Sequence, residues 1–234
     1  MQLSATQCQD ERNSAFARRN FLTGAAAISL LALPGCSTIG GFSYVEAVRR
    51  LLTLATQNAF ARLTREDGFW NSAVARINLP TLFGSRGGIA QTILTSALFR
   101  EKLQRRLNRF AEAGARRAAP VVADAVRTIG IENAVALLKG GPTAATTFLR
   151  DGMGPGVVNA MIPALDDVMR AADDPILGQA LSVLAGVDIS DAAHALAIEA
   201  DNAIWYEIGA AEADIRKDPQ STNDPLLIGV LTAL

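Results

Sequence analysis

The chain has 234 residues, of which half are hydrophobic and only 6% aromatic, and its formal net charge is −1. A nearly balanced charge gives no strong attraction to nucleic acid, so we expect no nucleic-acid partner. Much of the apolar content is alanine and leucine, which favour helices, and this composition predicts an all-α fold.

Residues 1–35 are predicted to be an export signal. Arg18 and Arg19 provide a basic start, and Phe21 and Leu22 open an apolar run that is too short to span a membrane as a helix. The paired arginines followed by these two apolar residues resemble a twin-arginine signal. Export through the general secretory route is the alternative.

The signal ends in a sequence, Leu33-Pro34-Gly35-Cys36, that resembles a bacterial lipobox. In this interpretation the Cys36 thiol carries diacylglycerol, and residues 36–43 form a lipidated tether. Two or more acyl chains hold a protein stably on a membrane, here from the periplasmic side. Serine rather than aspartate follows the cysteine, which by resemblance to bacterial lipoprotein sorting favours the outer over the inner membrane. Ordinary cleavage that leaves a free cysteine is the alternative.

Residues 44–234 are predicted to form one all-helical domain. Cys8 would be removed with the signal, so Cys36 could not form a disulfide within the chain, and stability must come from an apolar core. The charge is uneven: residues 46–127 carry a net +8 and residues 128–234 a net −10. We expect these halves to pack together and neutralise each other, and a partner-binding surface is the alternative.

Periodic apolar residues predict a compact bundle of about eight or nine helices with one short extended segment. The first helix covers 44–65 and ends at Gly68, which we expect to be left-handed. Pro120 has no amide hydrogen and should end a long helix. In chain order, the other predicted elements are an extended segment over 69–80, a turn over 85–88, and helices over 89–118, 121–129, 132–139, 143–150, 157–172, 176–184, 191–217 and 223–234.

Several stretches of this pattern resemble the domain of unknown function 4197 family. They cover residues 67–71, 74–80, 138–150 and 212–219, and their order and spacing agree over nearly the whole length from 47 to 227. The resemblance implies an exported, often lipid-modified, all-helical bacterial protein. It implies no particular reaction.

A candidate binding or structural motif between two predicted helices consists of Gly140, Gly141, Thr143 and Arg150. Backbone amides at the start of a helix can bind an anion, which is the functional interpretation. The favoured interpretation is a turn in which left-handed glycines end one helix and Thr143 caps the next.

Two further members of this candidate motif, Asn71 and Arg76, lie in and beside the extended segment. We expect them to fix the local backbone by hydrogen bonds, and a ligand cleft is the alternative. On the last long helix, Glu212 and Arg216 are spaced four residues apart and are expected to form a surface ion pair.

The sequence predicts no catalytic residue, no metal site and no cofactor. His194 is the only histidine, and one imidazole cannot make a strong zinc site without further ligands. A hydrolase needs two carboxyl groups that face one cleft, and the sequence does not place any pair of them in this way. A hydrolase is therefore the third hypothesis, with Glu199, Asp201, Glu207 and Glu212 as its available acids.

Four basic residues, Lys102, Arg105, Arg106 and Arg109, share one face of the long helix. Anionic lipid head groups are one expected target, although neutralisation by the acidic half or simple solvation is favoured. The sequence thus predicts a lipid-anchored periplasmic protein that is not an enzyme and that binds an envelope protein or supports the envelope. A carrier of an apolar or amphipathic ligand between helices is the alternative.

Overall fold

The computed structural model describes residues 38–39, 42–79, 96–182 and 186–234. A short antiparallel hairpin, β1 (Thr38–Ile39) and β2 (Phe42–Ser43), precedes the helices. In chain order the helices are α1 (Tyr44–Leu63), α2 (Gly68–Asn71), α4 (Ala97–Thr128), α5 (Ala134–Lys139), α6 (Ala144–Met153), α7 (Gly156–Ala172), α8 (Pro175–Ser182), α9 (Ile189–Lys217), the 3-10 helix η2 (Pro219–Thr222) and α10 (Pro225–Ala233). Over these ranges the fold is a single all-α domain, as predicted.

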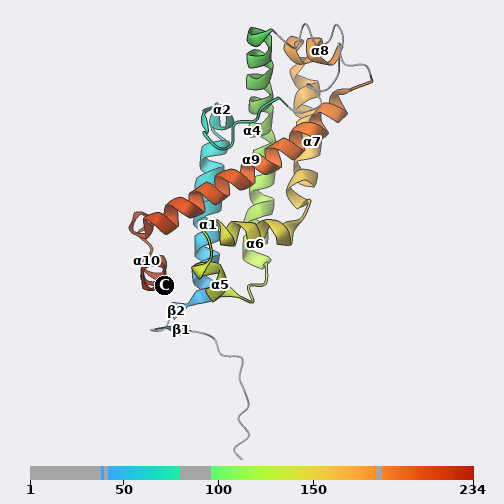
Figure 1. The fold of residues 1–234 in the computed structure, drawn as a ribbon. Coiled ribbons are helices and arrows are strands. Elements are labelled where there is room, and N and C mark those ends of the chain that lie inside the picture. Colours follow the sequence, from blue (N-terminus) through green and yellow to red (C-terminus); the bar gives the residue numbers. More distant parts are fainter. Residues whose placement is uncertain (1–37, 40–41, 80–95, 183–185) are drawn as a thin grey trace, which may run out of the picture. The chain divides into compact units, whose positions relative to one another are not determined.

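Helices α1 and α4 lie antiparallel (Figure 1). Arg49, near the start of α1, donates hydrogen bonds to the carbonyls of Val126 and Arg127 at the end of α4. At the other end of α1, Arg116 donates to the carbonyl of Thr64 over 2.8 Å. These contacts fix which part of α4 lies beside each end of α1.

The core lies between the four long helices. Helix α7 packs against α4 and α9, and α9 crosses α1 obliquely (Figure 1). Each of these helices contributes a fully buried leucine: Leu51, Leu107, Leu165 and Leu196. Burying one such side chain stabilises a fold by about 1.5–3 kcal/mol, so the core explains how the domain is stable without a disulfide.

Pro120 does not end its helix, so this prediction is wrong. Helix α4 continues through Pro120 to Thr128. Proline removes only one helical hydrogen bond, the one to the Arg116 carbonyl, and Pro120 itself is exposed to solvent. Ala118 and Val122, on either side of it, are fully buried and keep both parts of the helix packed on the core.

The first helix ends close to its predicted end, but the left-handed residue that follows it is not Gly68. Asp67, with φ at 54°, takes the left-handed conformation, whereas Gly68 begins the short helix α2. Gly68 is required by close packing, because a Cβ atom there would lie 2.3 Å from the carbonyl oxygen of Arg62. The extended segment therefore begins only after Asn71, rather than at residue 69 as predicted.

Aspartates cap three helices. Asp174 accepts from the amides at the start of α8, and Asp224 does so at the start of α10. For α9 the cap is Asp188, which forms a reciprocal pair with Asp191. Each such cap typically contributes about 1 kcal/mol to stability.

Ion pairs connect the basic half of the chain to its acidic half, as expected. Arg50 on α1 lies 3.1 Å from Asp224, and Arg62 lies 2.5 Å from Glu207 on α9. A third pair joins α4 to the start of α8 and belongs to the basic cleft described below. The opposite charges of the halves are therefore partly matched within the domain.

Several predicted features lie outside the described residues. They are the export signal over 1–35, the lipidation site Cys36, the turn over 85–88 and the start of the helix predicted from residue 89. In the ranges that the structure does describe, no helix has both the length and the apolar character needed to cross a bilayer.

Candidate functional site

The start of α6 is capped by a carboxylate from α9. Glu212 is fully buried and accepts hydrogen bonds from the amides of Ala145 (3.1 Å) and Thr146 (2.7 Å) and from the Thr146 hydroxyl (2.6 Å). Thr143 stands at the N-cap position, but its side chain makes no capping bond, so the prediction that it caps α6 is wrong. The anion position at this helix start is occupied by the protein's own carboxylate.

The same interaction reaches the end of α5. Arg216 lies 2.7 Å from the Glu212 carboxylate and donates to the carbonyls of Leu137 (2.9 Å) and Leu138 (2.7 Å). The Arg216 side chain is only 12% exposed, so the predicted surface ion pair is in fact a buried one. We call these two residues the α9 clamp, because they satisfy unpaired backbone groups at two helix ends.

The glycines between α5 and α6 are not left-handed, contrary to the prediction. Gly140 has φ at −66°, and in the described chain positive φ at glycine occurs at Gly154 and Gly186. A Cβ atom on Gly140 would lie 2.6 Å from the Cβ of Ala144, whereas one on Gly141 would meet nothing within 4 Å. Close packing of the turn against α6 therefore requires the first glycine.

Arg76 supports the local backbone, as expected. It donates from Nε to the carbonyl of Trp70, and its guanidinium carbon lies 4.8 Å from the centre of that indole ring. Asn71 is exposed, and its backbone amide donates to the Asp67 carbonyl over 2.9 Å. Asn71 ends α2 and Arg76 follows it, and α2 lies away from α5 and the double-glycine turn (Figure 1), so the predicted motif does not form one site.

Two members of that motif, Thr143 and Arg150, do meet in a cleft between α6 and α9. This cleft, here called the α6–α9 cleft, has a volume of about 180 Å³ and is lined by Thr143, Thr146, Thr147, Arg150, Trp205, Tyr206, Gly209 and Ala210. The aromatic wall formed by Trp205 and Tyr206 was not predicted from the sequence. An adjacent pair of aromatic residues in an alanine-rich helix was the available signal.

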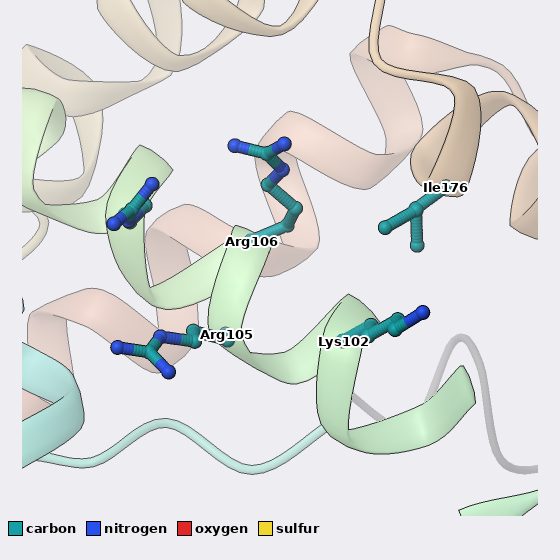
Figure 2. Close-up of a pocket in the computed structure, with 5 residues that line it drawn as sticks. Lys102, Arg105, Arg106 and Ile176 are labelled. Carbon is teal, nitrogen blue, oxygen red and sulfur yellow. The ribbon is translucent and has the colours of Figure 1, made fainter. Parts of the chain in front are cut away.

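A second cleft, the basic cleft, lies along α4 and has a volume of about 300 Å³. It is lined by the four predicted basic residues Lys102, Arg105, Arg106 and Arg109, and by Ile176 of α8. In Figure 2, Lys102, Arg105 and Arg106 leave α4 in different directions, and Ile176 stands above Lys102. The cations are therefore spread along the cleft and do not converge on one point.

Three of these cations, Arg105, Arg106 and Arg109, form ion pairs with carboxylates. Asp67 accepts from Arg105 over 2.7 Å and from Arg109 over 3.4 Å, and the Arg105 hydrogen bond holds the pKa of Asp67 below its usual value. Arg106 lies 2.6 Å from Asp174, which is the pairing with the acidic half that the sequence predicted. Among the described residues, Lys102 has no carboxylate within 4 Å.

Three of the four acids proposed for a hydrolase, Asp201, Glu207 and Glu212, have structural partners. Glu207 accepts from Arg62 (2.5 Å) and from the Ser72 hydroxyl (2.7 Å). Asp201 accepts from the Trp205 indole, although burial raises its pKa. Glu212 belongs to the α9 clamp. His194 is exposed on α9, and the described part of the chain has no cluster of residues suited to hold a metal ion.

Glu112 is a buried acid, and one of its carboxylate oxygens has no hydrogen-bond partner among the described residues. It lies on α4 with 5% of its surface exposed, and its Oε1 atom has no hydrogen bond among the described residues. Burial raises its pKa above the usual value, although Arg116 and Arg109 act in the opposite direction. Relative to the unfolded chain, folding therefore shifts this carboxyl group toward its protonated form.

These features define an all-helical domain with two polar clefts and with buried acids that make structural contacts. The chain belongs to the family described as Protein of unknown function (DUF4197), and the match covers residues 38–232. The family agrees with the resemblance seen in the sequence. Neither the curated proteins nor the solved structures gave a match to this chain.

The two glycines of the turn should respond differently to alanine. We expect Gly140→Ala to lower the free energy of unfolding by about 1–3 kcal/mol, because its methyl group overlaps Ala144. Gly141→Ala is the matched control and should be neutral or stabilising by up to about 1 kcal/mol, because it restricts the unfolded chain. Urea denaturation measures both, and equal effects would contradict the packing argument.

Removing the charge of the α9 clamp should destabilise the domain strongly. Glu212→Gln leaves Arg216 buried without a counter-charge, so we expect a loss of about 3–5 kcal/mol in the free energy of unfolding. Glu132→Gln, at an exposed acid before α5, should change it by less than about 0.5 kcal/mol. A Glu212→Gln variant as stable as the control in urea would show that the clamp contributes little.

Glu112→Gln should stabilise the domain in a pH-dependent way. The folded state holds the Glu112 proton more tightly than the unfolded state, so the wild-type free energy of unfolding falls as the pH rises above the usual carboxyl pKa of 4.5. The neutral amide removes this fall, so the advantage of the variant should be small below pH 4.5 and grow above it. Urea denaturation across this range, with Glu132→Gln as control, tests the expectation. An advantage that does not change with pH would contradict it.

Proposed function

We propose that the chain is a lipid-anchored protein of the periplasmic side of a bacterial membrane, with the outer membrane favoured, and that it binds an acidic envelope protein through the basic cleft. The proposed anchor is a lipid on Cys36, after export directed by residues 1–35. The resemblance of these segments to a twin-arginine signal and a lipobox supports this part. In this proposal the protein is not an enzyme.

The observation that supports the proposal is the distance between the start of α1, which follows the tether in the chain, and the basic cleft. Tyr44, the first residue of α1, follows Cys36 by eight residues. The start of α1 lies beside the end of α4, where Arg49 contacts Val126. Lys102 lies 24 residues before Val126 in the same helix, which is roughly 36 Å at ~1.5 Å per residue.

This distance favours a partner away from the anchoring membrane. A basic cleft at the far end of α4 is separated by about one helix length from the end that the lipid would hold. Contact with head groups of the same membrane would require α4 to lie flat on it. A periplasmic protein can reach the cleft whenever this end of α4 points away from the membrane.

The charges of the cleft suit an extended acidic surface. The side chains of Arg105, Arg106 and Arg109 remain 40–48% exposed although they are paired, and Lys102 adds a cation without a carboxylate partner in the described chain. A guanidinium has five N–H donors, so one ion pair leaves donors for a second acceptor. Because the cations point in different directions (Figure 2), several spaced carboxylates fit them better than one small anion.

A carrier function is the second candidate, and one pocket favours it. A pocket of about 320 Å³ between α1 and α4 is lined mainly by apolar atoms of residues that include Thr56, Pro120, Ala123 and Val126. The Thr56 hydroxyl is buried and has no hydrogen-bond partner in the described structure. An amphipathic ligand could supply both the apolar contact and the missing partner.

Photocrosslinking in the native envelope tests the leading proposal. A benzoylphenylalanine at Leu98, which is 64% exposed and one turn before Lys102, should capture a discrete protein. Lys102→Glu should reduce this product at least about fivefold because it reverses the charge of the unpaired cation, a loss of about 1 kcal/mol. Lys139→Glu is the matched control at an exposed lysine on α5 and should leave the product unchanged.

Two further arms separate the alternatives. The same crosslinker at Val45, at the start of α1, should capture lipid and not the protein partner. Cys36→Ser should abolish palmitate labelling and release the chain from the membrane. Capture of lipid alone from both positions would overturn the partner proposal. Membrane attachment that survives Cys36→Ser would overturn the anchor, and a ligand that co-purifies in place of a protein would favour the carrier.

A further inference from the structure

The α6–α9 cleft has one polar wall and one aromatic wall. Thr143, Thr147 and Arg150 follow one another at helical spacing along α6 and line one side. The other side is formed by Trp205, which is 3% exposed, and Tyr206, which is 61% exposed. One aromatic ring is therefore fixed in the protein and its neighbour on the same helix is largely open to solvent.

Both walls are held in place by hydrogen bonds. The indole of Trp205 donates to Asp201 over 2.9 Å, and Nη2 of Arg150 donates to Asn202 over 2.6 Å and to Asp201 over 3.2 Å. These bonds orient Arg150 through one of its nitrogens. The donors on Nε and Nη1 make no hydrogen bond in the described chain and are available to a ligand.

The two hydroxyl groups of the polar wall differ in what they can offer a ligand. Thr147 donates its own proton to the Thr143 carbonyl over 3.0 Å, which leaves its oxygen as an acceptor toward the cleft. Thr143 is exposed, and its side chain is not used to cap α6. The cleft thus offers hydroxyl acceptors, guanidinium donors and an aromatic face within one small volume.

This combination selects among classes of ligand. A simple anion would use Arg150 but would leave the aromatic wall without a function, and an apolar ligand would leave the guanidinium and hydroxyls without partners. A sugar ring has hydroxyls around its edge and C–H groups on its face, and it can use all of these groups together. The volume of about 180 Å³ is below the ~300 Å³ at which pockets for drug-sized ligands begin, so the cleft fits one ring.

We propose that the α6–α9 cleft binds one sugar ring of a glycan chain. The ring stacks its C–H face on Tyr206, and its hydroxyls exchange hydrogen bonds with Thr143, Thr147 and Arg150. The rest of the chain continues into solvent past the exposed side of Tyr206. This site is separate from the basic cleft, so it does not depend on the partner proposed there.

The two tryptophans provide an internal control for the test. The full chain with Cys36→Ser, labelled with ¹⁵N, should show two indole N–H signals, which Trp70→Phe assigns. Adding the trimer of N-acetylglucosamine should shift the Trp205 signal in a saturable way and leave the Trp70 signal unchanged. Trp70 lies beside Arg76 and Arg105, outside the α6–α9 cleft, and therefore reports non-specific effects.

Variants at the two walls sharpen the test. Tyr206→Ala should raise the dissociation constant at least about tenfold, and Tyr206→Phe less than about threefold, because the ring and not the phenol makes the stacking contact. Thr147→Ala should weaken binding by about two- to fivefold through one lost hydrogen bond. Thr232→Ala, at an exposed helical threonine on α10, is the control and should bind as the wild type does.

Three results would overturn the proposal. They are no saturable shift of Trp205 up to the solubility limit of the trimer, equal binding by the wild type and Tyr206→Ala, and a larger Trp205 shift with an acidic peptide than with the sugar. Because Tyr206 is exposed, its variants should fold, and circular dichroism checks this. If Tyr206→Ala were to unfold, the comparison of Thr147→Ala with Thr232→Ala would still decide the question.

Discussion

The ion pair of Glu212 and Arg216 is the interaction on which the positions of α5 and α6 depend. Taking two charges out of water is costly, and their attraction offsets this cost only when further hydrogen bonds satisfy both groups. Here the carboxylate accepts three bonds from α6, and the guanidinium donates to two carbonyls of α5. Helices of 6 and 10 residues are too short to be stable alone, so this pair, together with the buried side chains of Leu138 and Leu149, holds α5 and α6 on the domain.

The position of α6 in turn determines the α6–α9 cleft. Glu212 accepts hydrogen bonds from the first turn of α6, and Gly209, one turn earlier on α9, packs closely against Thr143, since a Cβ atom there would lie 3.1 Å from the Thr143 methyl carbon. The two helices therefore meet closely at the start of α6. At its other end, Arg150 is tied to Asp201 and Asn202 through longer side chains. The two helices are therefore close together at Gly209 and farther apart at Arg150, and the cleft lies between these two contacts.

The sequence predicted the positions of the helices better than the tertiary contacts between them. Apolar periodicity is a local signal, and it placed α1, α7 and α9 within a few residues of their ends. The errors at Pro120 and Gly68 arose because tertiary packing overrode local preference: a buried helix face continued past the proline, and a carbonyl approached the glycine. Within the α6–α9 cleft, Thr143 and Arg150 were predicted from the sequence as a local motif. Trp205 and Tyr206 on α9 were not, because whether they line a cleft depends on how α6 packs against α9.

The distribution of acids and bases explains why cations remain available at one end of α4. Most buried acids are close to backbone amides or single arginines: Glu212 caps α6, Glu207 accepts from Arg62, and Asp174 caps α8 while it pairs with Arg106. Acids in such positions stabilise the fold but cannot neutralise more than one neighbour. The bases of α4, in contrast, are long and partly exposed, so a single pairing orients them and leaves donors facing solvent. A chain with balanced total charge can therefore present a local excess of positive charge, and α4 carries this excess at the end remote from the start of α1.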